Sequence, residues 1–393
     1  MPIRKEIVGL KKEMIAWRRH LHAHPELGFH EHMTGDFVAE KLESWGLRVH
    51  RGLGGTGVVG VLAGQQGDGP SVGLRAELDA LPIAEKTGAS WASRHDGVMH
   101  ACGHDGHTAM LLGAAKHLSR SPAFGGTVTF IFQPAEEKGG GANVMIGDGL
   151  FEQHPMDSVW TLHNAPHLPC GMIAWTTGPA MSAVEDFDIE IQGTGGHAAR
   201  PYVANDPIGI ACRLQQELES LVRRSTDSYE EAMITVTRIR SGDSYNVIPS
   251  AATLSGTMRA LDDSVMDRLR SALSRLCSGY ETMFEAEIAV KQHLGYPVLV
   301  NRAENTALAA EVAAGVVGED RIYGRHPPVM GSEDFAFMLR HKPGAQIWIG
   351  GGPPDGDGPQ LHDPRYDFND AALTIGTEFL VSLTERLAAD GGG

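Results

Sequence analysis

The stretch TVTFIFQPAEE, residues 127–137, joins a β-branched and aromatic run to a proline and two adjacent carboxylates. An apolar run of this length predicts a strand that is buried on both faces. Comparable strands are expected at 58–62, 71–75 and 158–162, with helical stretches at 107–119 and 141–150. Strands that alternate with helices predict an α/β fold with a largely parallel sheet.

The alternation of predicted strands and helices changes near residue 179 and returns to the α/β order near residue 295. Between these points strands are expected at 187–191, 232–240, 251–259 and 284–291, with helices at 206–223 and 262–283. This order predicts a compact α+β unit with one helical face. We therefore predict an α/β domain formed by 1–178 and 295–393, interrupted by an inserted domain at 179–294.

Composition excludes several classes of function. The chain has 393 residues with 33 basic and 49 acidic side chains, so its net charge is 33 − 49 = −16. This balance argues against a nucleic-acid or anionic-membrane surface, and no apolar run reaches the roughly 18 residues that a membrane span needs. Four scattered cysteines and a charged N-terminal stretch without a signal-peptide core predict a cytoplasmic protein.

The segment HACGHDGH, residues 100–107, holds the densest group of potential metal ligands. Cys102 and His104 are two residues apart, so in an extended segment their side chains would point the same way. The glycines permit a tight turn between a strand and a helix. Four potential ligands within eight residues make an inert surface loop the weaker interpretation.

Glu136 and Glu137 follow directly after the strand expected at 127–132, where α/β sheets place their sites. In extended backbone adjacent carboxylates point in opposite directions. One could therefore bind a metal while the other faces the substrate as a proton carrier.

His163 ends the strand expected at 158–162, and His362 lies in a proline-rich loop. Together with Cys102, His104 and Glu137 they form a donor set that suits zinc or a neighbouring first-row ion. Five protein ligands exceed the four that one tetrahedral zinc takes, so we predict two metal ions that share a ligand.

Motifs in order along the whole chain resemble the M20 metallopeptidase family, in its amidohydrolase branch. The motifs are Arg75–Pro82, His100–His107, Glu136-Glu137, His163, Gly195-Gly196-His197, Asn246–Pro249, Gly256–Arg259 and Gly331–Phe335. The resemblance implies a zinc-peptidase-like catalytic domain and an inserted ferredoxin-like domain that serves as lid and dimerisation domain.

The resemblance also assigns roles to individual residues. The implied metal ligands are Cys102, His104, Glu137, His163 and His362. Glu136 resembles the general base, and Asp79 the carboxylate that orients a ligand. One departure stands out: Glu77 occupies a position where the family usually has aspartate, and where related peptidases carry a metal ligand.

In the inserted domain the resemblance makes His197 a donor that stabilises the oxyanion, delivered by closure and often from the neighbouring subunit. Arg259 is the expected clamp for a substrate carboxylate, because guanidinium binds carboxylate in a bidentate manner. Asn246 would add a hydrogen bond, and Gly331 and Ser332 would contact the substrate through their backbone.

The expected function is hydrolysis of N-acyl-L-amino acids by a cytoplasmic enzyme with two divalent ions, zinc first and manganese, cobalt or nickel as alternatives. A homodimer or dimer-based homotetramer is implied. The nearest alternative is a dipeptidase or exopeptidase of the same family. A non-catalytic metal sensor and nucleophilic catalysis by Cys102 are more distant alternatives.

Overall fold

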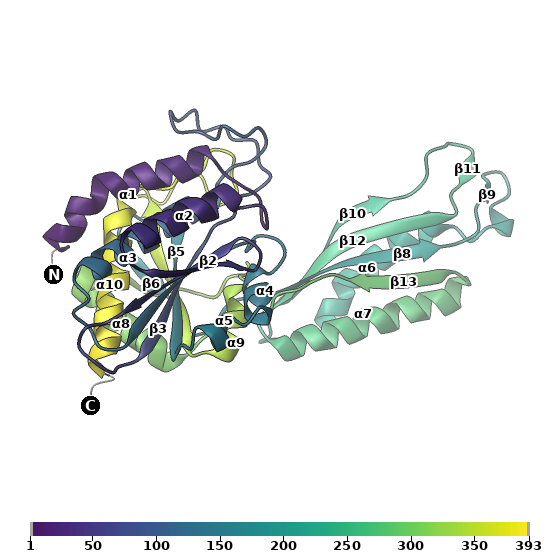
Figure 1. Ribbon diagram of the computed structural model, residues 1–393. Helices are drawn as coiled ribbons and strands as arrows, with labels where there is room; N and C mark the ends of the chain where they lie inside the picture. The colour runs from purple at the N-terminus through teal and green to yellow at the C-terminus, as the bar shows by residue number, and fades with distance from the viewer. Residues whose placement is uncertain (1–2, 391–393) are drawn as a thin grey trace. The chain divides into compact units, whose positions relative to one another are not determined.

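The computed structural model describes residues 3–390, which form two compact units (Figure 1). Unit 1 holds the chain up to Gly178, residues 300–327 and the chain from Asp334 onward. Unit 2 holds Pro179–Leu299 and residues 328–333. The second unit therefore extends a few residues beyond the expected boundary at 294 and gains a separate segment.

Unit 1 is an α/β unit built on one eight-stranded sheet, and the α/β class is confirmed. Its strands are β1 (Arg48–Leu53), β2 (Gly57–Ala63), β3 (Ser71–Glu77), β4 (Thr127–Gln133), β5 (Ser158–Pro169), β6 (Ile173–Trp175), β15 (Ile322–Arg325) and β16 (Gly344–Gly352). Its helices are α1 (Lys5–Ala23), α2 (His32–Ser44), α3 (His104–Arg120), α4 (Gly141–Gly147), α5 (Leu150–Gln153), α8 (Ala303–Val317), α9 (Phe335–His341) and α10 (Ala372–Asp390).

The sheet has the order β1-β2-β4-β3-β5-β16-β6-β15. Strands β4, β3, β5 and β16 run parallel, and so do β6 and β15. The pairs β1–β2, β2–β4 and β6–β16 are antiparallel. The four central strands are parallel, as predicted, but a hairpin at one end and the short β6 near the other make the sheet as a whole mixed.

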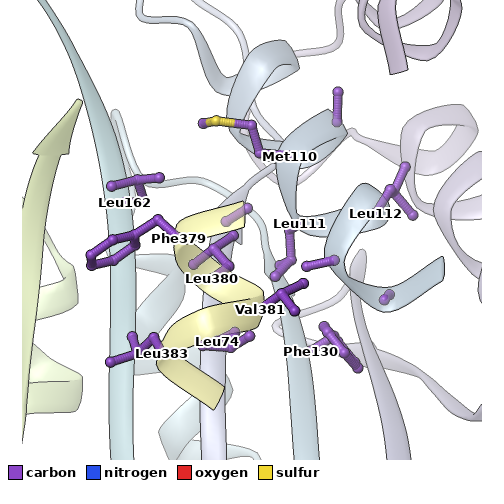
Figure 2. Close-up of a cluster of buried hydrophobic side chains, with 14 of the residues drawn as sticks. Leu74, Met110, Leu111, Leu112, Phe130, Leu162, Phe379, Leu380, Val381 and Leu383 are labelled. Carbon is purple, nitrogen blue, oxygen red and sulfur yellow. The ribbon is translucent and has the colours of Figure 1, made fainter. Parts of the chain in front are cut away.

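One large hydrophobic core lies between this sheet and the helices α1, α2, α3, α8 and α10. Figure 2 shows part of this core, to which Leu74, Phe130 and Leu162 of three neighbouring strands, Met110 of α3 and Phe379 of α10 all contribute. These strands are buried along nearly their whole length, as expected for β-branched runs with both faces covered. The core fixes the strand ends from which the candidate site is built.

Unit 2 contains a four-stranded antiparallel sheet with the order β10-β12-β8-β13 and two long helices. Its elements are β8 (Ala183–Gln192), β9 (Gly196–His197), α6 (Pro207–Ser225), β10 (Ala232–Arg240), β11 (Val247–Ile248), β12 (Ala251–Ala260), α7 (Asp263–Phe284) and β13 (Glu287–Gln292). Asp206 and Asp262 cap the two helices, each accepting a backbone N–H two residues on. Alternating residues of β8 are buried against them.

Two short strands, β7 (Gly178–Met181) and β14 (Leu299–Asn301), and two 3₁₀ turns, Pro201–Val203 and Glu319–Arg321, complete the elements that are described. Within residues 3–390, no helix combines the length and the apolar composition that crossing a membrane requires.

Candidate metal centre

A sharp turn before α3 brings Cys102 and His104 together. His104 is the first residue of α3, and Gly103 before it has φ 90°, in the left-handed region. The backbone between Cys102 and His104 is therefore not extended, and the tight turn that the glycines permit lies here. A left-handed glycine reverses the chain between the two side chains, so that the Cys102 thiol and the His104 ring still face the same region.

Glu136 and Glu137 lie in a turn rather than in the extended backbone that was predicted, because β4 ends at Gln133 and Ala135 is left-handed with φ 51°. Glu137 offers an oxygen to the same cluster as Cys102 and His104, and these three ligand atoms lie within 4.8 Å of one another. Glu136 is buried beside them, with Oε2 at 3.9 Å from His104 Nε2.

His163 and His362 reach the same cluster from other parts of unit 1. His163 lies inside β5, paired with Trp348, so the prediction that the strand ends at 162 is wrong. Its Nε2 is 3.6 Å from Cys102 Sγ. His362 Nε2 is 3.2 Å from Glu137 Oε1, and the His362 side chain is 52% exposed.

The orientation of His104 fits a metal ligand. Its Nδ1 lies 2.9 Å from the Asp79 carbonyl oxygen and 3.3 Å from Asp79 Oδ1, so the Nδ1–H donates to Asp79. In the neutral ring that a metal ion binds, the lone pair is then on Nε2, which is buried and has no hydrogen-bond partner. A buried nitrogen that is oriented through its other ring nitrogen and left unpaired is typical of a metal-binding histidine.

The electrostatics of the cluster also fit a cation. Burial raises the pKa of the Cys102 thiol well above its usual range, and the carboxylates of Glu137 and Glu136 raise it further. Burial alone would lower the pKa of His104, but its hydrogen bond to Asp79 and the surrounding carboxylates raise it to about 10. The nearby carboxylates contribute to both shifts, and a divalent cation held by these donors would offset that concentration of negative charge.

Glu77, the departure from the family pattern, belongs to a buried hydrogen-bond network beside the cluster, and the sequence did not predict that network. Its Oε2 is 2.8 Å from His107 Nδ1, and its other oxygen pairs with the Arg75 guanidinium. His107 Nε2 lies 2.6 Å from Asn164 Oδ1. Glu77, His104, His107 and His163 also present ligand atoms within 4.8 Å of one another. Arg75 and Glu77 are two residues apart on β3, so both point to the same face of the sheet, where both are buried. The available signal was the presence of two charged residues in an otherwise apolar strand.

Unit 2 brings His197 and Asn246 together. His197 is in β9 opposite Val247 of β11, and the backbone N–H of Ala198 donates to the Asn246 carbonyl oxygen over 3.0 Å. A cavity of about 740 Å³ is lined by both residues and by Ala251 at the start of β12.

Arg259 lies near the other end of β12 and contacts the segment 328–333, which carries Gly331 and Ser332. Its Nη1 donates to the Met330 carbonyl oxygen over 2.7 Å, and the neighbouring Gly331 carbonyl accepts the backbone N–H of Ser182 over 2.8 Å. From Ala251 to Arg259 the strand advances about 26 Å at about 3.3 Å per residue. Unit 2 therefore does not bring His197 and Arg259 into one site.

Comparison of the sequence with protein families finds one match that covers most of the chain. Residues 73–386 match peptidase family M20/M25/M40. The chain is 38% identical to a hippurate hydrolase from Campylobacter jejuni over 96% of this chain and 97% of that protein. It is also 38% identical to an N-acetyl-L-cysteine deacetylase from Bacillus subtilis over 96% of this chain and 89% of that protein.

The fold is similar to that of solved structures. A crystal structure from Bacillus subtilis, described as a dinuclear metal-binding peptidase from the M20 family, superposes with a TM-score of 0.83 at 31% identity. The match covers 97% of this chain and 99% of that one.

Proposed function

Because this chain belongs to peptidase family M20/M25/M40, we propose that it hydrolyses N-acyl-L-amino acids to a carboxylic acid and a free amino acid. It is an enzyme of the amidohydrolase type, and two relatives at 38% identity are named for hippurate hydrolysis and for N-acetyl-L-cysteine deacetylation. The observation that carries the proposal is the convergence of Cys102, His104 and Glu137 beside the carboxylate of Glu136.

The proposed ligands for two divalent metal ions are Cys102, His104, Glu137, His163 and His362. Thiolate and imidazole donors favour zinc, with manganese, cobalt and nickel as alternatives. When bound, such ions lower the pKa of a coordinated water and polarise the carbonyl that is to be cleaved. Asp79 holds the His104 ring through Nδ1, so Nε2 is oriented toward the cluster before any ion binds.

Glu136 is the proposed general base. Its carboxylate accepts a proton from the attacking water and returns it to the leaving amine, a role that typically contributes 10²–10⁴-fold to the rate. Nucleophilic catalysis by Cys102 is disfavoured, because its sulfur is a proposed metal ligand, and without a metal ion, burial and the nearby carboxylates raise the pKa of the thiol.

Unit 2 is proposed to supply the contacts to the substrate. Arg259 would clamp the free carboxylate, while Gly331 and Ser332 would offer backbone groups. His197 would donate to the developing oxyanion, with Asn246 beside it. In one copy of unit 2, the site of His197 and Asn246 and the site of Arg259 are separated by eight residues of β12, which is more than a small substrate spans. We therefore propose that His197 acts on a substrate bound to a second copy of the chain.

Replacing Glu136 by glutamine tests the proposal. We expect kcat for hippurate and N-acetyl-amino acids to fall about 10²–10⁴-fold while the metal content of the purified protein stays at the wild-type value. Glu137→Gln is the matched variant, since it should lose metal as well as activity. Turnover and metal content are measured on the same preparations, with simple dipeptides as comparison substrates.

Two results would contradict the proposal. Near-normal turnover by metal-loaded Glu136→Gln would show that Glu136 is not the general base. If the wild-type enzyme hydrolyses dipeptides faster than every N-acyl-amino acid, its substrates are dipeptides and the proposed substrate class is wrong.

A further inference from the structure

A carboxylate outside all the recognised motifs is completely buried next to the catalytic loop. Glu31 precedes α2 and has no exposed surface. Its backbone carbonyl accepts the N–H of Gly35 over 2.8 Å, which fixes the residue at the start of the helix. A carboxylate so deeply buried requires hydrogen-bond donors, and each of its two oxygens has one.

The two donors come from different parts of unit 1. Glu31 Oε1 accepts the backbone N–H of Ala135 over 2.8 Å, and Oε2 accepts the hydroxyl of Thr56 over 2.5 Å. Thr56 is itself buried. Glu31 therefore holds the residue that immediately precedes Glu136.

Ala135 needs such a partner because its backbone is left-handed, with φ 51°. This conformation is unfavourable for a residue with a Cβ atom and persists only where the surroundings hold it. Ala135 is completely buried, so a lost contact to its N–H could not be replaced freely by solvent. A relaxed Ala135 would turn Glu136 away from its present direction.

The residues just before Glu31 support the same loop. A Cβ on Gly28 would lie 3.0 Å from the Ala135 Cα, so the two backbones are in close contact. The backbone carbonyl of Glu26 accepts the N–H of Ala80 over 2.8 Å, and Ala80 follows Asp79 in the chain. Segment 26–31 thus contacts both chain segments that carry the proposed catalytic and orienting carboxylates.

We infer that Glu31 is a positioning residue for the hydrolytic reaction, acting through the backbone of Ala135 to direct the Glu136 carboxylate. This inference rests on the proposed function, in which Glu136 moves the proton. Misdirecting Glu136 slows the chemical step without changing the groups that hold the substrate, so the effect falls on kcat rather than on KM.

The experiment compares Glu31→Ala with Glu31→Gln in the metal-loaded enzyme. We expect Glu31→Ala to lower kcat at least about tenfold with KM within about twofold of wild type. Glutamine can accept the Ala135 N–H through its amide oxygen and donate to Thr56 through its amide nitrogen. Glu31→Gln should therefore keep kcat within about threefold of wild type. If Glu31→Ala does not fold, Glu31→Asp, whose shorter side chain cannot reach both donors, takes its place.

The matched control is Glu378→Ala. Glu378 is also a buried glutamate of unit 1 and accepts one backbone N–H, that of Arg4, over 2.9 Å. Its loss should lower the melting temperature without lowering kcat. The inference is overturned if Glu31→Ala retains wild-type kcat, or if Glu378→Ala lowers kcat by as large a factor as Glu31→Ala does. Absence of amide hydrolysis by the wild-type enzyme would instead refute the proposed function.

Discussion

At the scale of single residues, the histidines serve different purposes according to their neighbours. His22 of α1 is buried with Nδ1 at 2.8 Å from Asp105 Oδ2 and Nε2 at 3.3 Å from Glu85 Oε1. Burial alone would lower its pKa, but the charge and hydrogen bond of Asp105 and the hydrogen bond of Glu85 outweigh it and raise the pKa to about 9. His22 is therefore a buried cation that stabilises the fold beside α3.

This raised pKa predicts how stability changes with pH. A histidine whose pKa is higher in the folded state stabilises the protein fully below its unfolded pKa of about 6.5, and the contribution is lost as the pH rises through about 9. A shift from 6.5 to about 9 corresponds to on the order of 3 kcal/mol. The free energy of unfolding of His22→Gln should therefore fall furthest below wild type at pH 6, with the gap narrowing by pH 10.

Urea denaturation of both proteins at several pH values measures this gap. His32→Gln is the control, because the His32 side chain at the start of α2 is exposed and its replacement should cost little at any pH. A gap for His22→Gln that stays constant up to pH 10 would show that His22 contributes through packing rather than charge.

Residue types and spacing predicted which side chains converge in the metal centre, but not the residues that surround it. Cys102, His104 and Glu137 were identifiable because soft donors and carboxylates follow predicted strands. Glu77 and His107 also stood out in the sequence, but their contacts to each other and to Asn164 could not be predicted, because these residues become neighbours only when β3, α3 and β5 assemble. The role of Glu31 could not be predicted from the sequence, because its partner is a backbone N–H more than a hundred residues away.

At the scale of elements, the junction between the ligand loop and α3 depends on one glycine. Gly103 has φ 90°, and a Cβ there would lie 2.5 Å from Asn164 Oδ1. Both the backbone angle and the contact oppose a side chain, so the sharp turn that brings Cys102 to His104 requires glycine.

We expect Gly103→Ala to lower the free energy of unfolding by roughly 1–3 kcal/mol and to weaken metal binding at least about tenfold. The control is Gly9→Ala in α1, where a Cβ meets nothing within 4 Å and alanine should stabilise the helix by about 0.5–1 kcal/mol. Denaturation and metal titration of the two variants make the comparison. Wild-type metal affinity in Gly103→Ala would contradict this account of the turn.

Most long elements could be predicted from periodicity, whereas short ones could not. Strand β10 has the predicted bounds, and α7 begins and ends one residue later than predicted. The elements β15 and α9 have four and seven residues, too few for a periodic signal. The glycines of 100–107 indicated a turn before α3 but not its geometry, and propensity does not reveal the left-handed Ala135 that places Glu136 and Glu137 in a turn.

At the scale of the whole molecule, the arrangement of unit 2 decides how many chains a complete site needs. His197 and Arg259 are associated with opposite ends of β12. If His197 and Arg259 act on one substrate, two copies of the chain must contribute residues to each site. The predicted dimer would then be required for catalysis.

Mixing two inactive variants tests this. Each of Glu136→Gln and His197→Ala should be nearly inactive alone. After subunit exchange, half of the dimers contain both variants, and in these one of the two sites combines an intact Glu136 with the intact His197 of its partner. We expect about a quarter of wild-type activity to return. A mixture that exchanges subunits but stays inactive would mean that His197 acts within its own chain.

The domain limits were less predictable than the elements. Residues 328–333 belong to unit 2, although they lie far along the chain from Pro179–Leu299. No change of composition marks this segment, because its position follows from contacts such as the hydrogen bond from Arg259 to Met330.

The order of strands also has a consequence for synthesis on the ribosome. β16 pairs with β5, but 174 residues separate Pro169 from Gly344. At a translation rate of about 5–20 residues per second, one edge of β5 stays unpaired for roughly 9–35 s, while the ribosome synthesises all of Pro179–Leu299. An unpaired, buried-type strand is prone to aggregation, so the yield of native enzyme should depend on translation speed and on chaperones that cover nascent chains.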